Sequence, residues 1–124
     1  KGHIMTAPNL VNVTTINGKT TAVALGTGSA DILTCASNKL LKINSIIVSN
    51  IDGTNAATCN VLFYNSDNTT AFHICKLANV SAGDTLIALG KDAPIYLEEG
   101  DKIQALASAA SDLEIIVSYE EMDD

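Results

Sequence analysis

Residues 94–121 read PIYLEEGDKIQALASAASDLEIIVSYEE, and this stretch decides the fold that we predict. Apolar and polar residues alternate in it with period two, which is typical of strands that bury one face. Two groups of Gly, Ser, Asp and Glu interrupt the alternation and predict turns. The stretch therefore divides into strands at 95–98, 101–107 and 113–120, separated by turns at 99–100 and 108–112.

We predict that the last two of these strands form a hairpin. With a symmetric turn at 108–112, Ile103 faces Val117 and Ala105 faces Ile115. One register then satisfies the apolar faces of both strands, which is how side-chain patterns specify strand pairing.

The rest of the chain repeats this pattern of short strands and turns, and no segment shows a sustained helical period. Asn17-Gly18 is a favoured pair for a two-residue turn and predicts a first hairpin. The strands predicted in this part are 9–16, 19–25, 31–35, 40–50, 58–65, 71–76 and 85–89. Such lengths and spacings are typical of a sandwich or barrel. We predict an all-β fold, an antiparallel β-sandwich of about 8–10 short strands.

Length and composition limit the domain organisation. The chain has 124 residues, enough for one domain with a single core. Hydrophobic residues make up 47% of it but aromatic residues only 4%, so the core must be built from aliphatic side chains. We assign 1–4 to a cloning remnant, 5–121 to a single β-sandwich domain and 122–124 to an acidic tail. The acidic end, from Glu120 onwards, is expected to be frayed and solvated.

The charge of the chain excludes one class of partner. Its formal net charge is −7, and all seven basic residues are Lys. Nucleic-acid binding needs a cationic surface, so we predict no nucleic-acid partner. No window approaches the roughly 18 apolar residues of a membrane span, and no signal peptide precedes Thr6. We therefore expect no membrane contact and synthesis in a reducing compartment.

Three cysteines, Cys35, Cys59 and Cys75, and one histidine inside the domain, His73, are the candidates for chemistry. Cys59 and Cys75 lie eight residues on either side of Asp67, so a symmetric hairpin places them opposite one another. A disulfide there is geometrically feasible. An odd cysteine count without a signal peptide favours free, largely buried thiols instead.

A thiol–imidazole pair or a metal site is the alternative for His73 and Cys75, which are two residues apart on one predicted strand. Structural zinc sites use four ligands, and the chain offers three. Side chains at i and i+2 lie about 6.5–7 Å apart, too far for direct proton transfer. We therefore predict core packing, no catalytic residue, no metal and no cofactor. The segment DGTN at 52–55 resembles only a fragment of a calcium loop, and a turn is favoured there.

Two runs of the sequence resemble a known group of proteins: KINSIIVSNIDGTNAATCNVLFYN at 42–65 and IYLEEGDKIQALASAASDLEIIVSYEE at 95–121. Their order of features resembles small virion structural proteins of tailed bacteriophages, especially marine ones, over about residues 10–121. The resemblance implies a β-sandwich subunit of a head or tail. The segment LEEGDKI at 97–103 is also similar to the late Gly-Asp hairpin of trimeric jelly rolls such as the C1q and tumour-necrosis-factor-like domains, which implies a jelly-roll-like sandwich.

What the resemblance implies for function is a non-enzymatic virion structural protein, a capsid decoration or a tail-associated subunit. Such a protein is made in the host cytoplasm, is located in the virion, and acts through contacts with itself and with other virion proteins. The alternative is a carbohydrate-binding module or adhesin. Sugar sites usually need an aromatic platform. The chain has only five aromatic residues, and they lie mostly inside predicted strands, so a glycan partner is not favoured: Phe63, Tyr64, Phe72, Tyr96 and Tyr119.

Apolar residues on the second face of a strand predict self-association. Counted along 40–50, Ile46 and Val48 lie on the face opposite Ile43. In the last strand, Ile116 lies on the face opposite Ile115 and Val117, between Glu114 and Ser118. A two-sheet sandwich covers only its inner faces. We therefore predict that Ile46, Val48 and Ile116 form the interface of a closed homo-oligomer, with a trimer preferred through the jelly-roll analogy.

Overall fold

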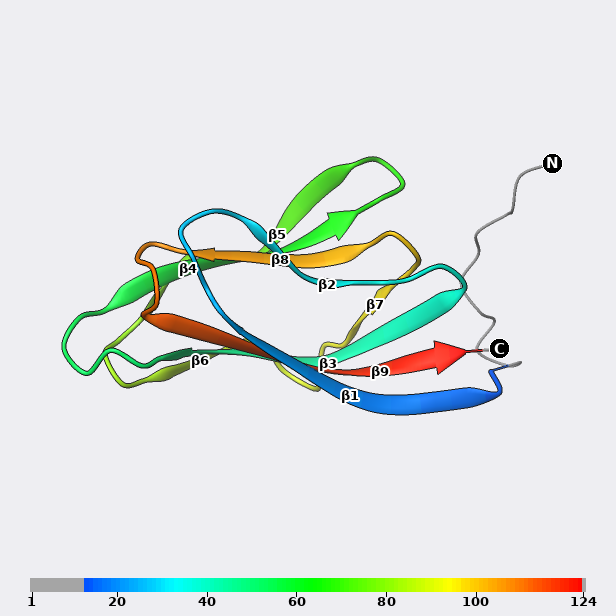
Figure 1. The fold of residues 1–124 in the computed structure, drawn as a ribbon, viewed down its shortest axis with the longest axis horizontal. Helices are drawn as coiled ribbons and strands as arrows, with labels where there is room; N and C mark the ends of the chain where they lie inside the picture. Colours follow the sequence, from blue (N-terminus) through cyan, green and yellow to red (C-terminus); the bar gives the residue numbers. More distant parts are fainter. Residues whose placement is uncertain (1–12, 124) are drawn as a thin grey trace.

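The computed structural model describes residues 13–123, which form nine strands and no helix. Their bounds are β1 (Thr15–Ala24), β2 (Ala30–Thr34), β3 (Lys39–Asn50), β4 (Ala57–Asn65), β5 (Thr70–Val80), β6 (Thr85–Leu89), β7 (Ile95–Leu97), β8 (Lys102–Ala107) and β9 (Leu113–Asp123). The strands make two antiparallel sheets that pack face to face (Figure 1). A five-stranded sheet has the order β1-β9-β3-β6, with β7 also paired to β3, and a four-stranded sheet has the order β2-β8-β4-β5.

The strands pair from the two ends of the chain inwards. β1 pairs with β9, β2 with β8, β3 with β6 and β7, and β4 with β5, and successive pairs alternate between the two sheets. The chain is thus one long hairpin rolled over itself, and the pairs β3–β9 and β4–β8 complete the two sheets. This is the connectivity of a jelly roll. The predicted all-β antiparallel sandwich is confirmed.

The predicted hairpin between the last two strands is wrong, because β8 and β9 belong to different sheets. The alternation itself is confirmed: Ile103 and Ala105 of β8 and Ile115 and Val117 of β9 are all buried. They meet across the core from opposite sheets rather than side by side. Alternation determines which face of a strand is buried but not which strand lies beside it. The five residues at 108–112 cross from one sheet to the other.

The predicted turn at Asn17-Gly18 is also wrong. β1 runs straight through these residues, and Asn17 and Gly18 pair with Glu121 and Glu120 of β9. A ten-residue ladder between the first and last strands outweighs the local turn preference of the Asn-Gly pair. The earlier part of that predicted hairpin, like the predicted cloning remnant at 1–4, lies outside the described residues.

The acidic end of the chain was predicted to be frayed, but it is part of a strand as far as Asp123. β9 continues to that residue between β1 and β3, and Met122 is buried. Two ion pairs hold this end: Lys19 Nζ lies 3.1 Å from Glu121 Oε1, and Lys39 pairs with Asp123. The predicted domain limit at 121 therefore falls inside a strand, while Asp124 lies outside the described residues.

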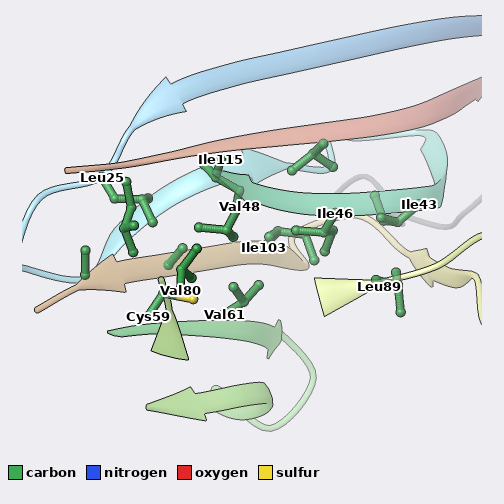
Figure 2. Packing of buried hydrophobic residues seen from close by; sticks show 14 of the residues in the cluster. Leu25, Ile43, Ile46, Val48, Cys59, Val61, Val80, Leu89, Ile103 and Ile115 are labelled. Atoms are coloured by element: carbon green, nitrogen blue, oxygen red, sulfur yellow. The ribbon is translucent and has the colours of Figure 1, made fainter. Parts of the chain in front are cut away.

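A β-bulge in β3 corrects the predicted interface. The register between β3 and β9 shifts between Ile43 and Ser45, which leaves Asn44 as an extra residue. An extra residue exchanges the two faces of the strand beyond it. Ile43 before the bulge and Ile46 and Val48 after it therefore all point into the core, each with 0% of its surface exposed (Figure 2). Ile46 and Val48 are core residues and offer no surface to a partner.

Candidate functional site

A line of apolar side chains crosses the outer face of the five-stranded sheet. Ile47 of β3 lies between the buried Ile46 and Val48, so it points away from the core. Its partners in the two neighbouring strands are Ile116 of β9 and Ile87 of β6. Residues that pair directly across strands share a face of the sheet.

The line ends at β1, where Ala22 pairs with Ile116. We call Ala22, Ile116, Ile47 and Ile87 the isoleucine row. With strands about 4.8 Å apart, a row across four strands is about 15 Å long. Ile87 is 67% exposed and Ala22 is exposed, whereas Ile116 and Ile47 are half-buried between their neighbours. Single exposed apolar residues are common on protein surfaces, but a continuous line marks a candidate contact surface.

Mostly Ser and Thr side chains border the isoleucine row on its two sides. On one side the Oγ atom of Ser49 and the Oγ1 atom of Thr85 lie 3.2 Å apart. By the strand registers, the bordering positions are Ala24, Glu114, Ser49 and Thr85 on that side, and Thr20, Ser118 and Ser45 on the other. Glu114 is the one charged residue among them. The isoleucine row therefore lies among mostly small side chains, which leave it accessible to a partner surface.

Of the three residues predicted for the interface, Ile116 alone lies in the isoleucine row. Ile47 was missed because the bulge at Asn44 is not visible in the pattern of residue types. Ile87 was missed because the strand that borders β6 is not predictable from its own five residues. The signal available in the sequence was the run of three apolar residues at 46–48, which requires at least one of them to face outwards.

The segment EEGD at 98–101, part of the run that carries the family resemblance, has a structural role. Asp101 is 6% exposed. Its Oδ1 atom accepts hydrogen bonds from the backbone N–H and the hydroxyl of Ser66, at 2.9 and 3.0 Å, and its Oδ2 atom accepts one from the Glu98 N–H at 3.0 Å. Gly100 has φ +87°, which favours glycine. The carboxylate thus ties the β7–β8 turn to the tip of the β4–β5 hairpin.

The DGTN segment at 52–55 is a turn, as the residues predicted. The Oδ1 atom of Asp52 accepts hydrogen bonds from the backbone N–H groups of Thr54 and Asn55 at 2.8 and 3.2 Å. These bonds lower the pKa of the Asp52 carboxyl below its usual range. Over residues 13–123 no group of three or more His, Cys, Asp and Glu side chains is arranged to hold a metal ion.

Each of the three cysteines is free. The predicted burial is confirmed for Cys35 and Cys59, whereas Cys75 is only half-buried. Removal of Cys35 from water raises the pKa of its thiol to about 12, and the nearby Asp101 carboxylate adds to the shift. Because the thiolate is the reactive form, Cys35 is an inert core residue.

The β4–β5 hairpin is confirmed, but its register differs from the symmetric one. Cys59 pairs with Ala78 and Cys75 with Val61, because the hairpin is centred one half-residue beyond Asp67, with Asn65 paired to Thr70, and two bulges then shift the strands further. His73 is exposed, and a bulge separates it from Cys75 in the ladder. The Cys59 and Cys75 thiols shift each other's pKa: that of Cys59 is raised and that of Cys75 is lowered.

An apolar hollow of about 360 Å³ lies between the two sheets beside the start of β7. Phe63 and Ile74 line it from the four-stranded sheet, and Pro94, Ile95 and Tyr96 line it from the other side. Tyr96 is exposed beside this hollow, whereas the other tyrosines in the described part of the chain are half-buried. The lining carries no charged side chain, so the hollow suits an apolar group or the face of a ring.

Comparisons with known proteins add little to this geometry. No protein-family model and no curated protein matches the sequence. Among solved structures, the chain is similar to one described as "Bacillus endospore appendages form a novel family of disulfide-linked pili", with 18% sequence identity, coverage of 89% of this chain and 90% of that chain, and a TM-score of 0.47. A likeness at this level does not transfer a function. The resemblance to phage virion proteins stays a prediction. The described part of the chain has no helix that is long and apolar enough to cross a membrane.

Proposed function

We propose that this protein is a non-enzymatic structural subunit of a bacteriophage virion, a capsid decoration or tail-associated protein that works through contacts between subunits. The observation that carries the proposal is the isoleucine row on the outer face of the five-stranded sheet. The jelly-roll fold and the two runs that resemble phage virion proteins also support it. In this proposal the row meets a second copy of the chain in a closed homo-oligomer, and the jelly-roll analogy favours a trimer.

The energy available from the row is sufficient to matter for assembly. Fully burying one Ile side chain contributes about 1.5–3 kcal/mol. About two-thirds of the surface of the Ile87 residue is exposed in the monomer, so covering it contributes about 1–2 kcal/mol per copy. Ile47, Ile116 and Ala22 add smaller amounts. Association costs several kcal/mol in lost freedom, so the row must act together with its border of Ser and Thr residues.

A pair of matched variants tests the row. Ile87→Asp places a charge on it, whereas Leu77→Asp places the same charge at an equally exposed apolar residue of the four-stranded sheet, since Leu77 is 65% exposed. We expect Ile87→Asp to give a folded monomer of 12.9 kDa and Leu77→Asp to keep the wild-type mass in light scattering. A folded Ile87→Asp variant with the wild-type oligomeric mass would show that the row is not the contact surface.

The location in a virion is tested separately. Purified phage particles that encode this chain should contain it at a copy number comparable to that of other structural proteins, by quantitative mass spectrometry. Its absence from particles that are washed and intact would overturn the virion assignment, whatever its oligomeric state.

A second candidate function is carbohydrate binding, and the exposed Tyr96 beside the apolar hollow is the observation that favours it. Sugar rings stack on exposed aromatic faces. A glycan array probed with the wild type and with Tyr96→Ala decides the matter: a signal that disappears in the variant supports this function, and a signal at background for both excludes it.

A further inference from the structure

Two of the three cysteines meet across the β4–β5 hairpin. Cys59 of β4 is buried in the core (Figure 2), and Cys75 of β5 is half-buried. Cys75 pairs with Val61, and Cys59 lies two residues before Val61 on the same inward face, so the two side chains are diagonal neighbours across the hairpin. A reagent from solvent therefore reaches the half-buried Cys75 before the buried Cys59.

The bulges of the hairpin produce this contact. In the ladder, Cys59 pairs with Ala78 and Cys75 with Val61, and the register shifts on both sides of the Val61–Cys75 pair. At the first shift Leu77 has φ +51°, and its N–H donates to Asn60 Oδ1 at 2.7 Å. Bulges bend a strand and re-aim its side chains, and they are frequent beside functional sites. Here they place Cys75 opposite Val61, diagonally across the hairpin from Cys59.

The surroundings of Cys75 favour its thiolate. The Cys59 thiol donates a hydrogen bond to the Cys75 sulfur, and the Val61 N–H donates another. These two bonds lower the pKa of Cys75 to about 7, against the opposing effect of partial burial. The same hydrogen bond, and then burial, raise the pKa of Cys59. Because the thiolate is the nucleophile in thiol–disulfide exchange, the two cysteines have different roles.

We propose that Cys59 and Cys75 are an oxidisable dithiol, in which Cys75 attacks a small-molecule disulfide and Cys59 resolves the product into a protein disulfide. In the first step the Cys75 thiolate forms a bond to one sulfur of the disulfide R–S–S–R, and one R–S⁻ leaves. In the second step Cys59 loses its proton to solvent and attacks the Cys75 sulfur, and the second R–S⁻ leaves. Two protein thiols are oxidised, and one small disulfide is reduced to two thiols.

The first step prepares the second. Once Cys75 is in a mixed disulfide, its sulfur carries no charge, so the hydrogen bond that held the proton on Cys59 is weakened. The sulfur that Cys59 must attack belongs to its diagonal neighbour across the hairpin. The resulting bond joins β4 to β5 and closes the hairpin whose tip, at Ser66, is held by Asp101. This inference does not depend on the virion assignment.

The test uses the full chain, reduced, freed of reductant and treated with oxidised glutathione. For the wild type we expect an intact mass lower by two hydrogens, no retained glutathione, and a Cys59–Cys75 linkage in peptide mapping. Cys59→Ala should instead retain one glutathione on Cys75. Cys35→Ala, as the control, should behave as the wild type.

A second variant guards against misfolding of Cys59→Ala. In Cys75→Ser the buried Cys59 should remain unmodified under the same conditions. The proposal is overturned by a wild type that retains glutathione as a stable mixed disulfide, that links Cys35 in place of either partner, or that does not react.

Discussion

Asp101→Asn is the substitution that most directly probes how the turn before β8 is held. In the wild type, Asp101 accepts two hydrogen bonds from Ser66 on one carboxylate oxygen and one from the Glu98 N–H on the other. An Asn side chain can keep the two bonds to Ser66 through its carbonyl oxygen. Its NH₂ group then faces the Glu98 N–H, so that two donors meet and a buried N–H loses its acceptor.

The size of the effect follows from this geometry. A hydrogen bond to a charged group contributes about 1.5–3 kcal/mol, and an unsatisfied buried donor costs about 1–3 kcal/mol. Because the two terms overlap at one site, we expect Asp101→Asn to lower the free energy of unfolding by about 2–3 kcal/mol. Asp101→Ala, which loses all three bonds, should cost about 3–5 kcal/mol.

Urea unfolding followed by circular dichroism measures both losses, and the slope of the transition should stay unchanged. Asp92→Asn, at an exposed position between β6 and β7, is the control for a change of net charge. An Asp101→Asn variant within about 0.5 kcal/mol of the wild type would refute the role assigned to this carboxylate.

Two further predictions concern single residues. Gly100→Ala should lower the free energy of unfolding by about 1–3 kcal/mol in the same urea assay, because φ is +87° at this position and a Cβ atom would lie 3.0 Å from Ser66. Gly53→Ala is the control: a Cβ atom there meets open space, so this variant should be close to neutral. Alkylation of Cys75 by iodoacetamide should rise with a midpoint near pH 7 in the native protein, from its lowered pKa, and the midpoint should return to near 9 in urea. Since the pKa is depressed in the folded state, its contribution to stability should be complete above about pH 9 and fade as the pH falls through 7. A native midpoint as high as the unfolded one would contradict the hydrogen bonds assigned to Cys75.

The sequence was informative about faces and short segments and uninformative about long-range partners. The strand at 85–89 matches β6, and the buried faces of β8 and β9 follow from simple alternation. The pairing partners of these strands cannot be predicted from alternation, because a jelly roll pairs residues more than 100 positions apart, as in Thr15 with Asp123. Local turn signals such as Asn17-Gly18 are overridden when such a distant strand lies alongside.

The candidate site was the hardest part to predict. A single extra residue, Asn44, exchanges the faces of the second half of β3 and moves Ile46 and Val48 from the predicted surface into the core. No residue type requires a bulge at that position. The isoleucine row also depends on four strands from distant parts of the chain, so its continuity appears only once their registers are known.

Sedimentation equilibrium of the wild-type chain tests the central claim most directly, that this jelly roll acts by associating with itself. At tens of micromolar we predict a mass that is a small multiple of 12.9 kDa, with three copies favoured. A single species of 12.9 kDa at every concentration up to that range would contradict the account.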